Sequence, residues 1–305
     1  MILDVQTFYT RVIELLANKR LHSYALKTKK SYTIVLNKRY MNGKIKYQFF
    51  TIRTMIYGNG YGGIIKIIRQ KFTIEIAGIP IGIESRFGST KQLYRDYLTK
   101  RLPWKTVSAF DEEMKLEGQA TPEEDEQLCI YRKIALLMMD YDAFLMHAAI
   151  INIDGQGIAF TAESGTGKTT RVMLWQKAFG KRMKVVNGDK PMMRFMNDGL
   201  YAYGTPWRGK EQMGENTSVP MKAVCFLQRG ETVSLQRMDA KDITKRLFKQ
   251  VLVPNNPMLM GQFMTLMERF VQEVPFYLYT CNMYKEEPAK LWEQIQAEQE
   301  VQYAV

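Results

Sequence analysis

The sequence predicts an α/β fold with a mixed sheet, preceded by a smaller β-rich region. A short apolar strand over 157–161 enters a glycine-rich turn and continues into a helix that ends at Gly180. The turn Asp154-Gly155 folds the preceding strand back onto this one, so the two strands pair antiparallel and not within a parallel βαβ unit. Farther along, predicted helices alternate with strands. Because both patterns occur in one segment, we expect a single mixed sheet with helices against it.

Residues 1–70 form the first predicted segment, a basic N-terminal extension. Residues 1–71 hold 14 Lys and Arg but only Asp4 and Glu14, a balance of +12 that equals the net charge of the whole chain. The remaining residues hold 29 basic and 29 acidic groups. Apolar spacing predicts a helix over 4–19, and basic residues alternate with Tyr and Phe in a β-prone pattern from Tyr24 onward.

Turns are predicted in this extension at Asn42-Gly43 and over 58–63. Basic and aromatic residues in alternation can form a face for nucleic acid or for an acidic peptide. Two plainer interpretations stay open: a solvated β-extension, or coding sequence ahead of an internal start such as Met55.

The second predicted segment, 71–126, is a small β/α subdomain with an acidic linker. A β-hairpin is predicted over 72–84, with its turn at Gly-Ile-Pro, and a short helix over 93–98. Residues 111–126 are acidic and contain Thr121-Pro122, which favours a linker or an exposed edge. We therefore place a domain boundary there and expect a kinase-like domain over 127–305.

The elements predicted in 127–305 follow from apolar periodicity, capping residues and turn residues. Helices are predicted over 128–139, 168–179, 239–252, 257–274 and 286–303, and strands over 144–153, 157–161, 183–187, 191–195, 200–203, 221–228, 232–237 and 275–282.

Composition excludes several classes of protein. The chain has 305 residues, of which 46% are hydrophobic, as in a globular protein with a full core. No apolar run reaches the ~18 residues that a membrane-spanning helix needs, and the first twenty residues do not suit a secretory signal. The cysteines Cys129, Cys225 and Cys281 are too few and scattered for a disulfide framework or a zinc site. We expect a cytoplasmic protein without a membrane partner.

The glycine-rich turn has the pattern of a phosphate-binding loop, because its backbone N–H groups and the following helix N-terminus favour anions. The expected ligand is ATP, held by Glu163, Ser164, Gly165, Thr166, Gly167, Lys168, Thr169 and Thr170. Lys168 would reach the β- and γ-phosphates, and Thr169 would bind Mg²⁺. The alternative is a chance glycine-rich turn. The strict pattern has Gly where Ala162 stands, and if that position needs φ > 0 the alanine costs about 1 kcal/mol.

Two further segments could meet a bound triphosphate. Asp189 follows a predicted strand, where its carboxylate could bind Mg²⁺ or take a proton from an acceptor hydroxyl. Residues 203–211 read Tyr-Gly-Thr-Pro-Trp-Arg-Gly-Lys-Glu, and Arg208 or Lys210 could steady a transferring phosphoryl group. The alternatives are a strand-end turn for Asp189 and a surface turn for 203–211.

The chain resembles the HPr kinase/phosphorylase family. Met146-His147-Ala148-Ala149 before a hairpin, residues 163–170, and Val186-Asn187-Gly188-Asp189 carry the resemblance, which covers roughly 72–290. The loop is also similar to that of ATP-dependent phosphoenolpyruvate carboxykinase, and smaller HPr-kinase-like proteins have a Tyr-Gly-Thr-Pro-Trp-x-Gly-Lys stretch. The resemblance implies a mixed-sheet P-loop core, ATP and Mg²⁺. It also implies that His147 polarises the acceptor or touches the γ-phosphate; a histidine in an apolar strand can equally be a hydrogen-bonded core residue.

The chain departs from this family at three places. Gly188-Asp189 stands where two consecutive acids are usual, Thr170 stands where HPr kinases have Glu, and no Arg-Gly-x-Gly segment is present. A single carboxylate must then serve as metal ligand or as base, or share one of these roles with another group. HPr itself is therefore not implied as the substrate.

We expect an ATP-dependent kinase that acts on a hydroxyl, in the first place a Ser or Thr, of a peptide, small protein or small molecule. The alternatives are a phosphoenolpyruvate carboxykinase-like enzyme or NTPase, and a nucleotide-binding module without catalysis. The sequence leaves a homo-oligomer open.

Overall fold

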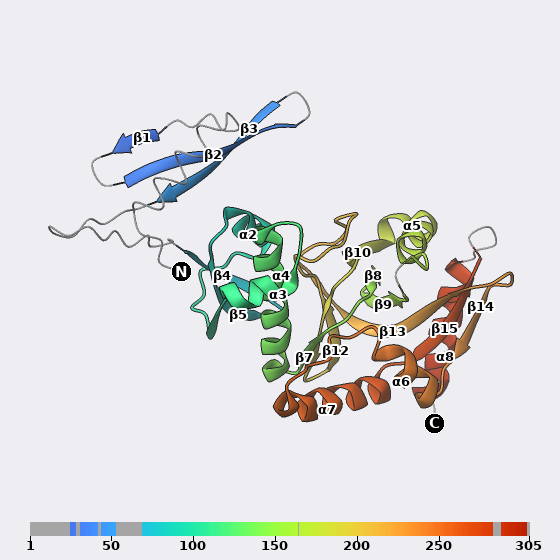
Figure 1. Ribbon diagram of the computed structural model, residues 1–305. Helices are drawn as coiled ribbons and strands as arrows, with labels where there is room; N and C mark the ends of the chain where they lie inside the picture. Colours follow the sequence, from blue (N-terminus) through green and yellow to red (C-terminus); the bar gives the residue numbers. More distant parts are fainter. Residues whose placement is uncertain are drawn as a thin grey trace. The chain divides into compact units, whose positions relative to one another are not determined.

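The computed structural model describes residues 25–28, 31–41, 44–52, 69–163, 165–282 and 288–303 (Figure 1). One compact unit comprises Met1–Gln70 with Ser85–Gly88, and the other comprises Lys71–Glu84 with Ser89–Val305. The helix predicted over 4–19, the turns predicted at Asn42-Gly43 and 58–63, and Met55 lie outside the described residues. The predicted division at 70 and 126 stays a prediction.

The first unit contains a three-stranded antiparallel sheet in the order β1-β2-β3. Its strands are β1 (Ala25–Thr28), β2 (Ser31–Met41) and β3 (Lys44–Ile52). The register places Met41 opposite Lys44, so β2 and β3 meet around the predicted turn position. The β-prone pattern of this segment is thus confirmed for the residues that the structure describes.

A second small sheet has the order β4-β5-β6, with β4 (Gln70–Ile76), β5 (Ile79–Ser85) and β6 (Lys105–Ser108). The turn lies at Ala77-Gly78, where φ is 50° and 78°, and not at Gly-Ile-Pro as predicted. Gly78 adopts the left-handed conformation readily, so the turn closes there and Ile79 already begins the next strand. The helix predicted over 93–98 is replaced by α2 (Gly88–Leu93) and the 3₁₀ turn η1 (Arg95–Tyr97).

Most of the acidic stretch 111–126 is helical, so it is not an irregular linker, whereas the domain boundary predicted there stays a prediction. It forms α3 (Asp111–Glu117) and the first turn of α4 (Pro122–Leu137). Glu113 accepts a hydrogen bond from the Phe110 N–H at 2.9 Å, and Thr121 Oγ1 accepts one from the Glu124 N–H at 3.3 Å. Both caps place acidic residues in a first helical turn, where the helix dipole favours negative charge.

The main sheet has nine strands and is mixed, as predicted. Its order is β10-β8-β9-β13-β12-β11-β7, and β15 pairs with both β13 and β14. β8 and β9 are antiparallel, whereas β13 is parallel to β9 and to β15. The strands are β7 (Ala143–Leu145), β8 (Ala149–Ile153), β9 (Gln156–Thr161), β10 (Met183–Asn187), β11 (Met192–Met196), β12 (Gly199–Tyr203), β13 (Ser218–Arg229), β14 (Ser234–Arg237) and β15 (Phe276–Cys281).

The single strand predicted over 144–153 is divided into β7 and β8. Between them the N–H groups of residues 146, 147 and 148 donate to the carbonyls of Pro191, Gln250 and Asp189, at 3.3, 2.6 and 3.0 Å. These bonds to separate segments redirect the chain, so β7 pairs with β11 while β8 pairs with β9 and β10. His147 therefore lies between β7 and β8, where the chain is hydrogen-bonded to residues 189–191 and to residue 250.

Helices cover both faces of the main sheet. Buried side chains of α6 (Ala240–Leu247) and α7 (Pro257–Glu273) pack on one face, and those of α5 (Lys168–Phe179) and α8 (Pro288–Tyr303) pack on the other (Figure 1). The helix predicted over 239–252 ends at Leu247, because the N–H groups of residues 249 and 250 donate to the Arg246 and Leu247 carbonyls, three residues back and not four. Within the described part of the chain, no helix combines the length and the apolar character that crossing a membrane requires.

Candidate active site

The glycine-rich loop and Asp189 emerge at the same edge of the main sheet. β8 is antiparallel to both β9 and β10, so β9 and β10 run in the same direction. The loop follows the carboxyl end of β9 and leads into α5, and Asp189 follows the carboxyl end of β10. The topology therefore brings together two segments that the sequence separates.

Local hydrogen bonds close the loop. The Thr166 N–H donates to the Glu163 carbonyl at 3.3 Å, and Lys168 Nζ donates to the Ala162 carbonyl at 3.0 Å. Gly165 and Gly167 have φ of 79° and 114°, which explains why glycine stands at both positions. Ala162 is not among the residues with positive φ, so the alanine that replaces the expected glycine carries no backbone strain. Ser164 lies outside the described residues.

The N-terminus of α5 is built to accept an anion. Gly167 stands at the N-cap without a side-chain cap, and the first turn has no acidic residue. Thr169 and Thr170 lie in this turn and are half-buried. Because the N–H groups of a first helical turn have no partner within the helix, they can bind phosphate oxygens together with the helix dipole.

Asp189 forms the centre of a polar cluster. Its Oδ1 lies 3.1 Å from His147 Nε2 and its Oδ2 lies 3.0 Å from Lys190 Nζ. Burial alone would raise the pKa of Asp189, but the His147 hydrogen bond and the charge of Lys190 together hold this pKa below its usual value. The carboxylate is therefore ionised at neutral pH. Lys190 is a site residue that sequence reasoning missed, although it directly follows Asp189.

Lys168 and Tyr131 lie within the electrostatic influence of Asp189. Burial lowers the pKa of the Lys168 ammonium, an effect that the charge of Asp189 opposes and that of Lys190 reinforces. Burial and the charge of Asp189 both raise the pKa of the Tyr131 hydroxyl on α4. Lys168, His147, Asp189 and Lys190 thus form one cluster around the start of α5.

Asn187 fixes the backbone on which Asp189 stands. Its Oδ1 accepts hydrogen bonds from the N–H groups of Asp189 and Lys190 at 2.9 and 2.8 Å. Its Nδ2 donates to Thr205 Oγ1 and to the Thr205 carbonyl at 3.0 and 3.2 Å. Asn187 and Thr205 are both fully buried, and Thr205 Oγ1 also donates to the Lys190 carbonyl at 2.6 Å. The pair therefore joins the 187–190 turn to the 203–211 segment.

Residues 203–211 contact α4 and the 3₁₀ turn η1. Trp207 packs edge-on against Tyr131 with ring centroids 4.7 Å apart, and Arg208 Nη2 lies 3.1 Å from Asp96 Oδ2. Lys210 is exposed. The structure thus pairs Arg208 with Asp96, and among the described residues no hydrogen bond or ion pair joins Arg208 or Lys210 to the glycine-rich loop. Their role in phosphoryl transfer stays a prediction.

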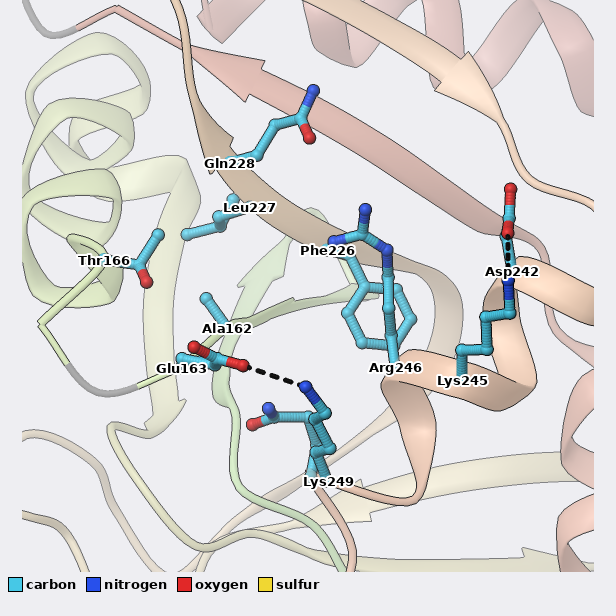
Figure 2. Close-up of a pocket in the computed structure, with 11 residues that line it drawn as sticks. Ala162, Glu163, Thr166, Phe226, Leu227, Gln228, Asp242, Lys245, Arg246 and Lys249 are labelled. Atoms are coloured by element: carbon cyan, nitrogen blue, oxygen red, sulfur yellow. Dashed lines mark hydrogen bonds and ion pairs between the residues drawn. The ribbon is translucent and has the colours of Figure 1, made fainter.

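A second set of residues contacts the loop from β13 and from the turn that follows α6. Arg229 Nη2 donates to the Gly165 carbonyl at 2.7 Å, and Lys249 Nζ lies 3.2 Å from Glu163 Oε1. A cavity of about 580 Å³ separates these elements from the loop (Figure 2). Sequence reasoning missed this wall, although Asp242, Lys245 and Lys249 recur at the helical spacing of one face.

No family model matches the chain, and no curated protein matches it. Among solved structures, the HPr(Ser) kinase/phosphatase from Coxiella burnetii is similar at 14% identity and a TM-score of 0.32, over 52% of this chain and 92% of that one. The likeness is distant.

The site suits a Mg²⁺–triphosphate by the chemistry of its donors. Mg²⁺ prefers oxygen ligands and is commonly bound by one or two protein groups together with substrate phosphates and waters. Thr169 supplies a hydroxyl in the first turn of α5, and Asp189 supplies an ionised carboxylate at the same sheet edge. Such a site needs no cluster of three His, Cys, Asp or Glu side chains, and none is found in the described part of the chain.

Proposed function

We propose that this protein is an ATP-dependent kinase that transfers the γ-phosphate to a hydroxyl, in the first place a Ser or Thr, of a peptide, small protein or small molecule. One observation carries the proposal: a glycine-rich loop closed by Lys168 lies at the same sheet edge as an ionised, doubly hydrogen-bonded Asp189. The loop suits a phosphate chain, and the carboxylate suits a cation or a hydroxyl.

The loop and its lysine would hold the phosphates. The N–H groups of the loop and of the first turn of α5 donate to phosphate oxygens, and Lys168 compensates the charge of the β- and γ-phosphates. Thr169 and Asp189 would hold Mg²⁺, which neutralises negative charge on the triphosphate when bound. Lys190 adds a second cation beside Asp189.

Asp189 would also orient the acceptor. An oxygen of the acceptor hydroxyl attacks the γ-phosphorus, the bond from that phosphorus to the β–γ bridging oxygen breaks, and ADP leaves. The hydroxyl proton passes to the Asp189 carboxylate. In a loose transition state this proton leaves late, so a carboxylate with a lowered pKa is a sufficient base and mainly positions the hydroxyl. His147 keeps the carboxylate in place through Oδ1.

The experiment follows radiolabelled γ-phosphate from Mg-ATP in the presence of a mixture of Ser- and Thr-containing peptides. The wild-type protein should label peptides, and Asp189→Asn should lose this transfer while it still binds ATP. Asp198→Asn, an exposed substitution on the same sheet, should behave like the wild type.

Three other outcomes would overturn the kinase assignment. Phosphoenolpyruvate formed from oxaloacetate would indicate a carboxykinase-like enzyme, and release of inorganic phosphate without transfer would indicate an NTPase. Tight ATP binding without transfer or release of the γ-phosphate would indicate a nucleotide-binding module.

A further inference from the structure

A cavity of about 580 Å³ adjoins the glycine-rich loop on the β13 and α6 side. Figure 2 shows the loop residues Ala162, Glu163 and Thr166 along one wall, with Lys245, Arg246 and Lys249 along the other. Pockets that take drug-sized ligands span about 300–1,000 Å³, so the cavity has room for a nucleoside.

The lining of the cavity suits an amphipathic ligand. Ala162, Phe226 and Leu227 supply apolar surface, and Gln228 and Gln250 supply amide groups. The other lining residues are polar or charged, so the cavity offers more hydrogen-bonding and ionic groups than the mainly apolar pockets that bind most small molecules. A purine or pyrimidine nucleoside has this character, because it joins a flat apolar ring with polar edges to a hydroxylated sugar.

One wall of the cavity, here called the α6 wall, consists of α6 and the turn that follows it, and its basic side chains differ in whether they have an acidic partner. Lys249 lies 3.2 Å from Glu163 and Lys245 lies 4.0 Å from Asp242. Among the described residues, Arg246 forms neither an ion pair nor a hydrogen bond through its side chain, and it is only half exposed. A guanidinium is planar and weakly hydrated, so it stacks on aromatic rings more readily than an ammonium does.

The two sides of the loop differ in chemistry. On one side His147 and Lys190 contact the ionised carboxylate of Asp189, which suits the acceptor hydroxyl. On the α6 side both lining carboxylates, Glu163 and Asp242, lie beside lysines. In the strand order β10-β8-β9-β13 the cavity lies on the β13 side of the loop and Asp189 follows β10 on the other side, so a nucleoside in the cavity leaves the Asp189 carboxylate free for the acceptor.

We infer that this cavity is the nucleoside half of the substrate site, with the Arg246 guanidinium stacked on the base. Lys249 exchanges Glu163 for the α-phosphate when the nucleotide binds. This inference rests on the proposed function, because it requires the triphosphate in the loop.

The test compares Mg-ATP with Mg-tripolyphosphate, which has the phosphate chain but no nucleoside, by calorimetric titration of the full chain. The wild-type protein should bind ATP more tightly than tripolyphosphate. Arg246→Ala should weaken ATP binding about five- to tenfold, as the loss of one stacked cation implies, and change tripolyphosphate binding less than about twofold. Lys241→Ala, an exposed lysine on α6 outside the cavity lining, should change neither.

Three results overturn the inference. ATP and tripolyphosphate could bind the wild-type protein equally, Arg246→Ala could weaken both alike, or Arg246→Ala could weaken neither. Adenosine competition against ATP on the wild-type protein gives a readout that needs no variant, and failure of adenosine to compete also counts against the nucleoside site. Lys168→Ala distinguishes a failure of the nucleoside site from a failure of the proposed function, because it should weaken the binding of both ligands. If it weakens neither, the loop assignment itself fails.

Discussion

His147 Nε2 lies 3.1 Å from Asp189 Oδ1, and the backbone fixes both residues independently of this contact. The His147 N–H donates to the Gln250 carbonyl at 2.6 Å, and the Ala148 N–H donates to the Asp189 carbonyl at 3.0 Å. Thr161 Oγ1, at the end of β9, donates to the His147 carbonyl at 2.8 Å. The imidazole and the carboxylate are therefore held together at the start of the glycine-rich loop.

The charge of Asp189 should make stability depend on pH. Because its folded pKa is lowered, the stabilisation is fully present above the unfolded pKa of about 3.9 and is lost as pH falls through the folded value. Thermal unfolding of the wild type and of Asp189→Asn from pH 3 to 7 should show the largest difference at pH 5–7 and a smaller one toward pH 3. A difference that stays constant with pH would contradict the lowered pKa.

Asn187→Ala should destabilise the protein by about 2–4 kcal/mol, because it leaves buried donors and acceptors around Thr205 and residues 189–190 without partners. Chemical denaturation measures this change. Asn255→Ala removes an exposed amide and should change stability by less than about 0.5 kcal/mol. Equal effects of the two substitutions would show that the Asn187 network contributes nothing particular.

Gly209→Ala should lower both stability and phosphoryl transfer. Gly209 has φ of 76°, and a Cβ there would lie 3.0 Å from the Asp189 Cβ, so the substitution costs about 1 kcal/mol or more and pushes the carboxylate. Gly261→Ala is the matched control, since a Cβ at this position in α7 meets nothing within 4 Å. It should stabilise by about 0.5–1 kcal/mol. Activity retained in Gly209→Ala would contradict the close approach to Asp189.

The basic extension should bind polyanions through its sheet. The β2–β3 register pairs Arg39 with Lys46, and residues 1–71 hold 14 Lys and Arg against two acidic residues, so this segment has the charge that a polyanion needs. Replacing both by Gln should weaken binding of single-stranded DNA at low salt and reduce the slope of log K against log salt. Lys100→Gln, an exposed lysine elsewhere, serves as the control. A slope that the double substitution leaves unchanged would favour a solvated extension.

Much of the main sheet could be predicted from local signals. Asp154-Gly155 marks a hairpin that the structure confirms, and Gly180 ends α5 as expected. The acidic helices α3 and α4 were missed because high charge resembles a linker, although the capping residue Thr121 was visible in the sequence.

The predictions that were wrong concern features that depend on contacts between segments distant in the sequence. The break between β7 and β8 needs carbonyls at positions 189, 191 and 250, which no local pattern reveals. The ion-pair partners of the basic side chains could not be predicted from the sequence either, because Arg208 pairs with Asp96, whereas Lys190 lies beside Asp189. The α6 wall of the cavity is some eighty residues from the loop in sequence, so only the fold brings Lys249 to Glu163.

Binding of Mg-ATP to the wild type and to Lys168→Ala, measured by calorimetry, tests the central claim most directly. Lys177→Ala, an exposed lysine near the other end of α5, is the control. We predict that Lys168→Ala loses ATP binding by at least about tenfold while its thermal unfolding stays close to that of the wild type, and that Lys177→Ala binds normally. ATP binding that is unchanged in Lys168→Ala would contradict the assignment of this loop to the triphosphate.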